Sequence, residues 1–422
     1  MSSVATLKTR ETLRLCTAGS VDDGKSTFVG RLLHDTKSVL ADQLESMEKS
    51  SKDRGFDGLD LSLLVDGLRA EREQGITIDV AYRYFATDKR TFILADTPGH
   101  VQYTRNTVTG MSTSQVVVVL IDARHGVVEQ TRRHLNVAAL LGVRHVILGV
   151  NKIDLVDFSE SVFREIETEF NAAAHRLGIE DTHVVPISAL RGDNVVEPST
   201  NMPWYDGPTV LEVLEDFPVN RGRAADLDFR LPIQYVIREH ATDYRGYAGR
   251  IEAGSVKVGD TVHLEGGRTT TVTHIDRPEA SESAAHGDSV TLRLADDIDL
   301  ARGDLISGAA RPESVRSFAA TVVALTEKDL QVGPMYKIRY GTKLVKGRIT
   351  AIERSLDLDN VAEDVLEPEK VTLNDIAHIT IEVAEELPVE DYAARGAVGN
   401  FLLIDPSTGN TLAAGLIGHR LR

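Results

Sequence analysis

The sequence has almost no cysteine, fewer basic than acidic residues and no long apolar run. Cys16 is the only cysteine in 422 residues, which excludes an internal disulfide and a metal site built from several cysteines. The start of the chain lacks the apolar segment of a signal peptide, and no run approaches the ~20 apolar residues that a membrane span needs. These absences predict a soluble, cytoplasmic protein.

The charge balance is acidic, with 64 acidic and 47 basic residues and a formal net charge of −17. Such a chain repels nucleic acid and anionic membranes on average, although a local basic patch can still bind either. Hydrophobic residues make up 42% and charged residues 26%, which excludes a disordered, collagen-like or mucin-like chain. At about 150 residues per domain, the length predicts about three domains.

Short apolar runs alternate with longer helix-compatible stretches up to about residue 216. The runs are nearly all apolar and end at Gly, Asp, Asn or Pro, which is typical of strands covered on both faces of a parallel sheet. This alternation predicts a doubly wound, mostly parallel α/β domain over residues 1–222. The expected strands are 13–18, 91–95, 116–121, 145–150 and 183–187, and the expected helices include 130–141 and 159–177.

The pattern changes after residues 197–208, which are rich in Pro, Ser and Asn. Short alternating runs follow, separated by turn residues, as in a β-barrel or β-sandwich. We therefore predict two β-barrel domains, over residues 223–312 and 313–422. Their expected strands are 231–238, 249–253, 261–264, 269–275, 290–294, 321–325, 336–340, 346–352 and 378–383, and the segment 254–259 is expected to be a turn.

A phosphate-binding loop is predicted between the first strand and the helix that follows it. The segment matches the pattern GxxxxGK[ST], in which two glycines let the backbone fold around phosphate so that its N–H groups face the anion. Lys25 would reach the β- and γ-phosphates, and the Ser26 hydroxyl would ligate Mg²⁺. The predicted nucleotide-binding residues of this loop are Gly19, Ser20, Val21, Asp22, Asp23, Gly24, Lys25, Ser26 and Thr27.

A base-reading motif follows the apolar run at 145–150. The predicted residues are Asn151, Lys152, Ile153 and Asp154, and the carboxylate of Asp154 can accept two hydrogen bonds from the N1–H and N2–H₂ edge of guanine. Adenine offers no such pair of donors, so the carboxylate selects GTP over ATP. After the strand at 183–187, backbone groups of Ser188, Ala189 and Leu190 are expected to contact the base. Taken alone, Ser188-Ala189 is better explained as an ordinary helix cap, and only the other motifs favour the base contact.

A third motif ends the strand at 91–95 and reads Asp96, Thr97, Pro98, Gly99 and His100. Asp96 would hold Mg²⁺ through water, and the N–H of Gly99 would contact the γ-phosphate. Standing alone, the pattern is an ordinary strand-ending turn. Beside a γ-phosphate, a neutral His100 imidazole can orient the attacking water.

Thr77 completes the set, because its hydroxyl and carbonyl can bind Mg²⁺ and the γ-phosphate and order the surrounding loop when GTP is bound. The four motifs occur in the order phosphate loop, Thr77, the Asp96 motif and the Asn151 motif. Together they predict a GTPase with GTP and Mg²⁺ as ligands, in which His100, Lys25 and Thr77 are catalytic and Ser26, Thr77 and Asp96 hold the metal.

These motifs carry a family resemblance. EREQGITID, DTPGH and NKID resemble the translation-factor class of GTPases, such as elongation factor Tu. Within that class, GSVDDGKST at 19–27 resembles the GTPase (large) subunit of sulfate adenylyltransferase, because elongation factor Tu has His at the position of Asp23. GRLLHDTK at 30–37, PIQYVIRE at 232–239 and DLARGDLI at 299–306 are similar too.

The resemblance implies a heterodimer with a smaller catalytic subunit, which would convert ATP and sulfate to adenosine 5′-phosphosulfate and pyrophosphate. GTP hydrolysis on this chain would drive that unfavourable reaction. By the same resemblance, Val21 and Ile76 would keep His100 away from the γ-phosphate until a partner acts; the alternative is that both side chains simply pack under the loop. The segment RGYAG at 245–249 would either contact the catalytic subunit or form a tight turn of the barrel, and we favour the turn. The alternative function is delivery of aminoacyl-tRNA to the ribosome.

Overall fold

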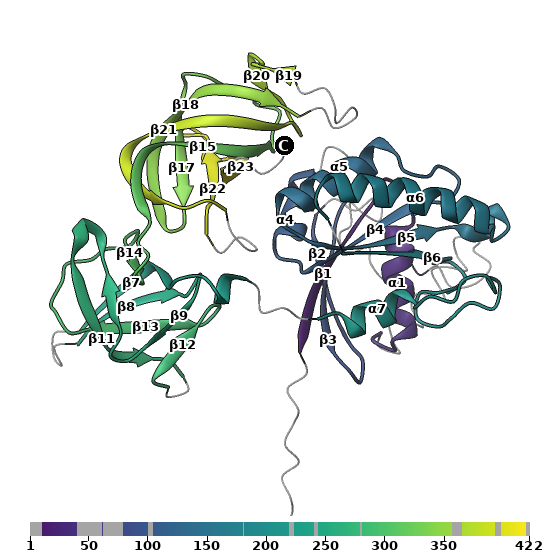
Figure 1. Cartoon of the computed structure of the whole chain (residues 1–422), viewed down its shortest axis with the longest axis horizontal. Coiled ribbons are helices and arrows are strands. Elements are labelled where there is room, and N and C mark those ends of the chain that lie inside the picture. Colours follow the sequence, from purple (N-terminus) through teal and green to yellow (C-terminus); the bar gives the residue numbers. More distant parts are fainter. Residues whose placement is uncertain are drawn as a thin grey trace, which may run out of the picture. The chain divides into compact units, whose positions relative to one another are not determined.

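The computed structural model describes residues 11–39, 61, 79–99, 104–179, 181–218, 223–239, 244–278, 281–356, 365–392 and 398–418. Contacts divide the chain into two compact units, Met1–Val219 and Asn220–Arg422 (Figure 1). No helix in the described ranges is long and apolar enough to cross a membrane.

The first unit contains a six-stranded sheet in the order β2-β3-β1-β4-β5-β6. All its neighbouring strands are parallel except β2, which pairs antiparallel with β3 at the edge of the sheet. The strands are β1 (Thr12–Ala18), β2 (Ala81–Ala86), β3 (Thr91–Asp96), β4 (Val116–Asp122), β5 (His145–Asn151) and β6 (Asp181–Pro186).

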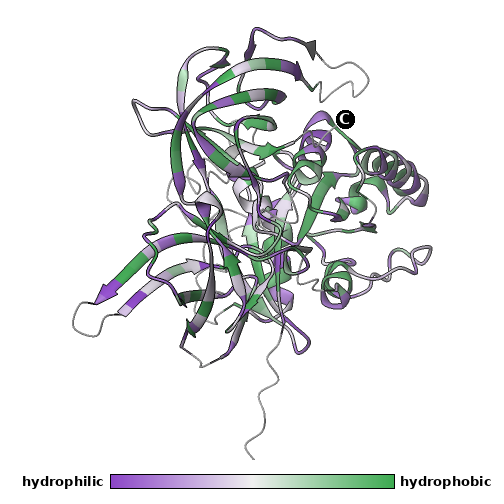
Figure 2. Cartoon of the chain, turned by 60° about the vertical axis from the view of Figure 1, so that its left-hand side comes forward, coloured by the Kyte–Doolittle hydropathy of each residue, from purple (hydrophilic) through white to green (hydrophobic). Residues whose placement is uncertain are grey.

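Helices cover both faces of this sheet, and Figure 1 shows α5 and α6 on one side and α1 and α7 on the other. Every residue of β4 is buried, which explains its unbroken apolar run. Figure 2 shows the same sheet as predominantly hydrophobic. The helices are α1 (Lys25–Asp35), α4 (Thr104–Ser112), α5 (Glu129–Leu140), α6 (Glu160–Arg176) and α7 (Val210–Asp216), with a short 3₁₀ turn at Ile153–Val156. Two further 3₁₀ turns, at Arg223–Ala225 and Glu265–Gly267, belong to the second unit.

The second unit begins with a closed barrel in the order β10-β11-β13-β8-β7-β14. Alternate side chains of its strands are buried, as in β13, so that one face of each strand fills the barrel. Its strands are β7 (Arg230–Glu239), β8 (Tyr244–Arg250), β10 (Thr261–His263), β11 (Thr269–Asp276), β13 (Ser289–Leu294) and β14 (Leu305–Ser307), and a separate pair joins β9 (Ser255–Lys257) to β12 (Ser283–Ala285).

The rest of this unit is a seven-stranded sheet in the order β17-β22-β23-β15-β21-β18-β19. An additional pairing between β17 and β18 joins the sheet back on itself, so that six of its strands form a ring. The strands are β15 (Glu313–Ala324), β17 (Met335–Tyr340), β18 (Lys343–Ser355), β19 (Val365–Leu366), β21 (Ile376–Val389), β22 (Asn400–Ile404) and β23 (Thr411–Ile417), beside the pair β16 (Leu330–Gln331) and β20 (Lys370–Val371).

The predicted fold class, an α/β phosphate-loop domain followed by two β-barrels, is confirmed, whereas three local predictions are wrong. Residues 245–249 form part of strand β8 rather than a turn, and the strand expected at 249–253 lies instead at Tyr244–Arg250. A Cβ on Gly249 would lie 2.6 Å from the Pro232 carbonyl oxygen, so that glycine permits close strand approach rather than a reversal. The segment 254–259 contains the short strand β9. The division at residues 222 and 312 stays a prediction.

Candidate guanine-nucleotide site

The phosphate loop connects β1 to α1 and is shaped by two glycines with positive φ. Gly19 has φ 150° and Gly24 has φ 86°. A Cβ on Gly19 would lie 2.6 Å from the Leu120 carbonyl oxygen, and one on Gly24 would lie 2.4 Å from Nδ2 of Asn151. Only glycine fits either position, because both the backbone conformation and the available space exclude a side chain.

Lys25 begins α1, and its side chain folds back over the loop. Its Nζ donates to the carbonyl oxygens of Gly19 at 2.9 Å and Ser20 at 2.7 Å. A Cβ on Gly99 would lie 2.2 Å from this Nζ, so the third motif closes directly over the ammonium. Burial lowers the pKa of Lys25, and the negative charges of Asp96 and Asp23 partly oppose that shift.

Asp23 stiffens the loop from inside. Its Oδ2 accepts a hydrogen bond from the backbone N–H of Ser20 at 2.6 Å, and its side chain is buried. Burial raises its pKa, while the hydrogen bond from Ser20 and the charge of Lys25 lower it. Val21, predicted as one half of a gate, is 41% exposed on this loop. Its predicted partner Ile76 lies outside the described residues.

Asp96 lies fully buried at the end of β3, next to the loop strand β1. The hydroxyl of Thr17 donates to Asp96 Oδ1 at 2.7 Å, and the hydroxyl of Thr97 donates to the Thr17 carbonyl at 2.5 Å. Thr107 of α4 in turn donates to the Pro98 carbonyl oxygen at 3.1 Å. These bonds fix the carboxylate and the following turn against β1. His100 and Thr77, the predicted catalytic residues of this region, lie outside the described residues.

Asn151 joins the base-reading motif to both neighbouring loops. Its Nδ2 donates to the Asp23 carbonyl oxygen at 2.7 Å, and its Oδ1 accepts from the backbone N–H of Ala189 at 3.0 Å. The backbone N–H of Ile153, which is fully buried, donates to the carbonyl of Ile187 at 3.3 Å. The motif is therefore tied to the phosphate loop on one side and to the 188–190 loop on the other.

Lys152 adopts a left-handed conformation with φ 58° and forms an ion pair that the sequence analysis did not predict. Its Nζ lies 3.0 Å from Oδ2 of Asp122, the last residue of β4. Arg124 also contacts this carboxylate, through Nε at 2.9 Å and through its terminal nitrogen at 2.6 Å. These hydrogen bonds hold the pKa of Asp122 far below its usual range, although its burial opposes them. The sequence does contain a signal for this ion pair: Asp122 ends an apolar parallel strand, in the same way that Asp96 ends β3.

Asp154, the predicted guanine reader, has a side chain that is only 7% exposed. Its Oδ2 lies 3.5 Å from Nε of Arg191, which also packs 5.7 Å from the ring centre of Phe158. Leu190, immediately before Arg191, is 53% exposed. The carboxylate therefore lies between the 3₁₀ turn at Ile153–Val156 and the 188–190 loop, with one cation beside it.

Arg31 of α1 holds the 188–190 loop in place, which the sequence analysis also missed. Its Nε donates to the Ala189 carbonyl at 3.1 Å and its terminal nitrogen donates to that of Leu190 at 2.5 Å. Ser188 is fully buried, and its hydroxyl accepts from the backbone N–H of Arg191 at 3.3 Å. One helix therefore carries Lys25 at its phosphate end and supports the predicted base loop about 1.7 turns later, at Arg31.

The predicted residues that the structure describes gather at the carboxyl edge of one sheet, where ligands bind in open α/β folds. The set comprises Gly19, Ser20, Val21, Asp22, Asp23, Gly24, Lys25, Ser26, Thr27, Asp96, Thr97, Pro98, Gly99, Asn151, Lys152, Ile153, Asp154, Ser188, Ala189 and Leu190. No group of three or more His, Cys, Asp or Glu in the described ranges could hold a metal by itself. The oxygen donors of Ser26 and Asp96 are nevertheless the kind that Mg²⁺ takes together with phosphate and water.

Comparisons with known proteins agree with this geometry. Residues 10–219 match the family model "Elongation factor Tu GTP binding domain", and residues 317–418 match "GTP-eEF1A C-terminal domain-like". "Sulfate adenylyltransferase subunit 1" of Cellvibrio japonicus is 46% identical over 419 residues, covering 98% of this chain and 88% of the relative. The chain belongs to the sulfate adenylyltransferase subunit 1 family. It carries the GTP-binding domain of that family.

Two further relatives also match nearly the whole of this chain. "Bifunctional enzyme CysN/CysC" of Mycobacterium tuberculosis is 49% identical over 412 residues, covering 96% of this chain and 67% of the relative. "Sulfate adenylyltransferase subunit 1" of Saccharophagus degradans is 45% identical over 413 residues, covering 97% of this chain and 87% of the relative.

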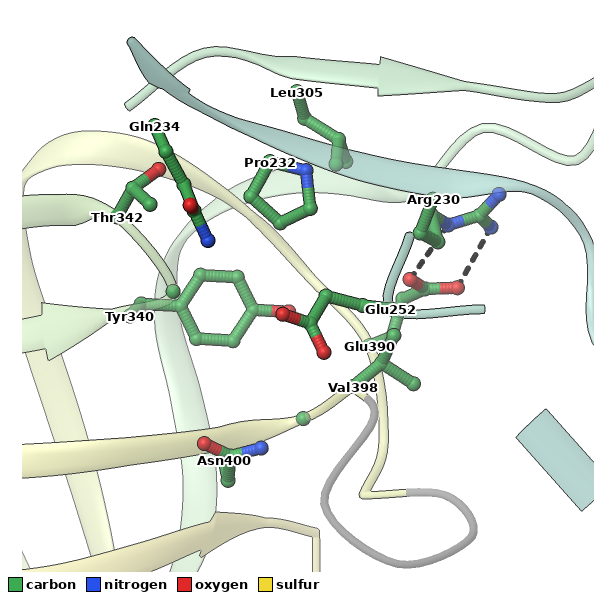
Figure 3. A pocket seen from close by; sticks show the side chains of 12 residues that line it. Arg230, Pro232, Gln234, Glu252, Leu305, Tyr340, Thr342, Glu390, Val398 and Asn400 are labelled. Atoms are coloured by element: carbon green, nitrogen blue, oxygen red, sulfur yellow. Dashed lines mark hydrogen bonds and ion pairs between the residues drawn. The ribbon is translucent and has the colours of Figure 1, made fainter. Parts of the chain in front are cut away.

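A cavity in the second unit lies beside the strand β7 (Figure 3). It has a volume of about 200 Å³, and its main charged contact is the pair of Arg230 with Glu390, at 2.8 Å for both hydrogen bonds. Figure 3 shows Tyr340 pointing toward Glu252 across the cavity. Burial raises the pKa of Tyr340 to about 12 and that of Glu252 above its usual value. The Arg230–Glu390 pair links β7 to the segment after β21, so we assign this cavity a structural role.

Proposed function

We propose that this chain is the GTPase subunit of sulfate adenylyltransferase. It hydrolyses GTP, and hydrolysis drives the reaction of ATP with sulfate to adenosine 5′-phosphosulfate and pyrophosphate on a separate, smaller catalytic subunit. The observation that carries the proposal is the match, over 98% of this chain, to a relative called sulfate adenylyltransferase subunit 1. Family membership favours this function over delivery of aminoacyl-tRNA.

The chain's own residues would bind and position GTP. The backbone N–H groups of the loop at 19–26 and the positive end of α1 face the phosphates, and the Lys25 ammonium moves from its loop carbonyls to the β- and γ-phosphates. Ser26, Asp96 and Thr77 would hold Mg²⁺, which would neutralise charge on the phosphates. Asp154 reads guanine at the other end of the site.

His100 and Thr77 complete the proposed reaction. Thr77 would bind the γ-phosphate, and His100 would orient the water that attacks it, giving GDP and inorganic phosphate. Val21 and Ile76 would keep the imidazole out of line until the partner acts. The sulfate chemistry belongs to the partner, and the sequence contains one phosphate-loop motif, which the GTP site uses. We place the complex in the cytoplasm.

The test is GTP hydrolysis by the purified chain, alone and with the small subunit, ATP and sulfate. We expect hydrolysis that the partner and its substrates stimulate, with adenosine 5′-phosphosulfate formed in step with GDP. The Lys25→Ala chain is the control for contaminating GTPases. Hydrolysis that is indifferent to the small subunit but accelerated by ribosomes would reject the proposed function in favour of the delivery factor.

A further inference from the structure

Two neighbouring strands of the second unit, β17 and β18, carry cations on one face, and β22 adds an apolar side chain beside them. Lys337 of β17 lies directly opposite Lys346 of β18, and Arg339 lies opposite Leu344 of β18 and Leu402 of β22. Directly paired residues of antiparallel strands point to the same face. These five side chains therefore form one surface, which we call the basic–apolar face.

This face points away from the barrel core. Tyr336 and Ile338, which alternate with the cations along β17, are 4% and 0% exposed and belong to the hydrophobic core. On the outer side Leu344 is 46% exposed, Leu402 is 37% exposed, and Met335 at the start of β17 is 48% exposed. Large apolar side chains gathered on an open sheet face, among polar ones, mark an interaction surface.

The cations of this face differ from their neighbour Arg348 in their ion pairing. None of Lys337, Arg339 and Lys346 forms an ion pair within the described part of the chain, whereas their neighbour Arg348 pairs with Glu382 at 2.6 Å. Two lysines placed directly opposite each other destabilise the sheet. The chain has 64 acidic and 47 basic residues, so acidic side chains are plentiful, yet among the described residues these three cations cluster without them. The cluster weakens the fold and favours binding of an anionic partner.

We propose that the basic–apolar face docks an acidic surface of a partner protein; resting on the proposed function, that partner is the small catalytic subunit. The leucines and the methionine distinguish a protein partner from nucleic acid. Surfaces that bind single-stranded nucleic acid combine cations with aromatic stacking platforms, and this face presents none. Protein interfaces instead combine Met and Arg with apolar side chains at their centre.

The test measures binding of the purified small subunit to the full chain at low and high ionic strength. The first variant, Lys337→Gln/Lys346→Gln, removes the repulsion between the lysines, so its melting temperature should stay the same or rise. The second is the reversal K337E/R339E/K346E. The control is R144E/K257E/R268E, which has the same net charge as the reversal and alters exposed cations without ion pairs among the described residues.

We expect wild-type binding that weakens with salt, a loss of about 10-fold or more in the reversal variant, and near wild-type binding in the control. GTP binding by every variant should be unchanged. If the wild type, the reversal variant and the control bind the small subunit equally well, the proposal that this face is the docking site is rejected, while the proposed function still stands. No binding by wild type would reject both proposals. Binding of single-stranded RNA that the reversal abolishes, with subunit binding intact, would assign the face to nucleic acid instead.

Discussion

Nδ2 of Asn151 donates a hydrogen bond to the carbonyl oxygen of Asp23 at 2.7 Å, across 128 positions of sequence. The same side chain accepts a hydrogen bond from the backbone N–H of Ala189 at 3.0 Å. One buried amide therefore holds the phosphate loop, the base-reading motif and the 188–190 loop in register. A shift of any of these segments would move the contacts to both ends of a nucleotide.

The first prediction concerns this amide. Asn151→Ala should lower the melting temperature and weaken GDP binding about 10-fold or more, because it leaves buried backbone groups unpaired at about 1–3 kcal/mol each. Thermal unfolding and the GDP dissociation rate measure the two effects. The control is Asn201→Ala, which removes an amide that is exposed and bonded to Asp193. An effect no larger than that of the control would contradict the bridging role.

Lys25→Ala should abolish GTP turnover, because it removes the side-chain charge over the β- and γ-phosphates. It also removes the positive charge that lies beside the carboxylates of Asp96 and Asp23. Single-turnover hydrolysis and GTP binding are the measurements. Lys89→Ala serves as the control, since that lysine is 58% exposed and pairs with Glu215 at the surface. Wild-type turnover in the Lys25 variant would refute the assignment.

Asp154→Asn should weaken GTP binding and favour xanthosine triphosphate, because the new amide donates where the carboxylate accepted. Competition between the two nucleotides measures the change. Arg191→Met is the matched control, since it removes the ion pair at 3.5 Å but keeps the carboxylate. That control should still prefer GTP. If the Asp154 variant binds both nucleotides as wild type does, Asp154 does not read the base.

His100→Ala should lower partner-stimulated GTP hydrolysis by about 100-fold or more while sparing GTP affinity, as expected when a contact of the transition state alone is removed. The measurements are the turnover rate with the small subunit present and the dissociation constant for GTP. His183→Ala, on β6 and 46% exposed, is the control. An unchanged turnover rate would exclude His100 from catalysis.

Stability should fall in mild acid because of His134 on α5. Burial, together with the charges of Lys25 and Arg133, lowers its pKa from 6.5 to about 3. Below pH 6.5 the His134 imidazole is protonated in the unfolded chain, whereas in the folded chain it stays neutral down to about pH 3. The free energy of unfolding therefore declines as pH falls through this window. Between roughly pH 6.5 and 5.5 the loss is about 1 kcal/mol.

Urea unfolding at several pH values measures this loss. His134→Leu should flatten the decline, whereas His175→Gln, a change at an exposed position of α6, should not. Parallel curves for wild type and the His134 variant would show that the proton uptake occurs elsewhere.

Much of the first unit could be predicted from sequence, because its central strands are apolar runs with clear ends. The expected strands at 13–18 and 145–150 differ from β1 and β5 by one residue at an end. Strand β2 was missed because it lies at the sheet edge, where Tyr82 and Tyr84 stay exposed and no apolar run marks it. In the barrel, glycines that admit close strand approach were mistaken for turn residues.

The nucleotide motifs, their order and the fold class are legible in the amino-acid sequence, since each motif is a short segment whose chemistry depends on residue type and spacing. The side chains that support these motifs are brought to them only by the folded arrangement of the strands. Arg31 reaches the Ala189 carbonyl across 158 positions, and Asp122 pairs with Lys152 from the neighbouring strand. Such partners meet because the parallel order β1-β4-β5-β6 brings strand ends to one edge, and no local pattern encodes that order.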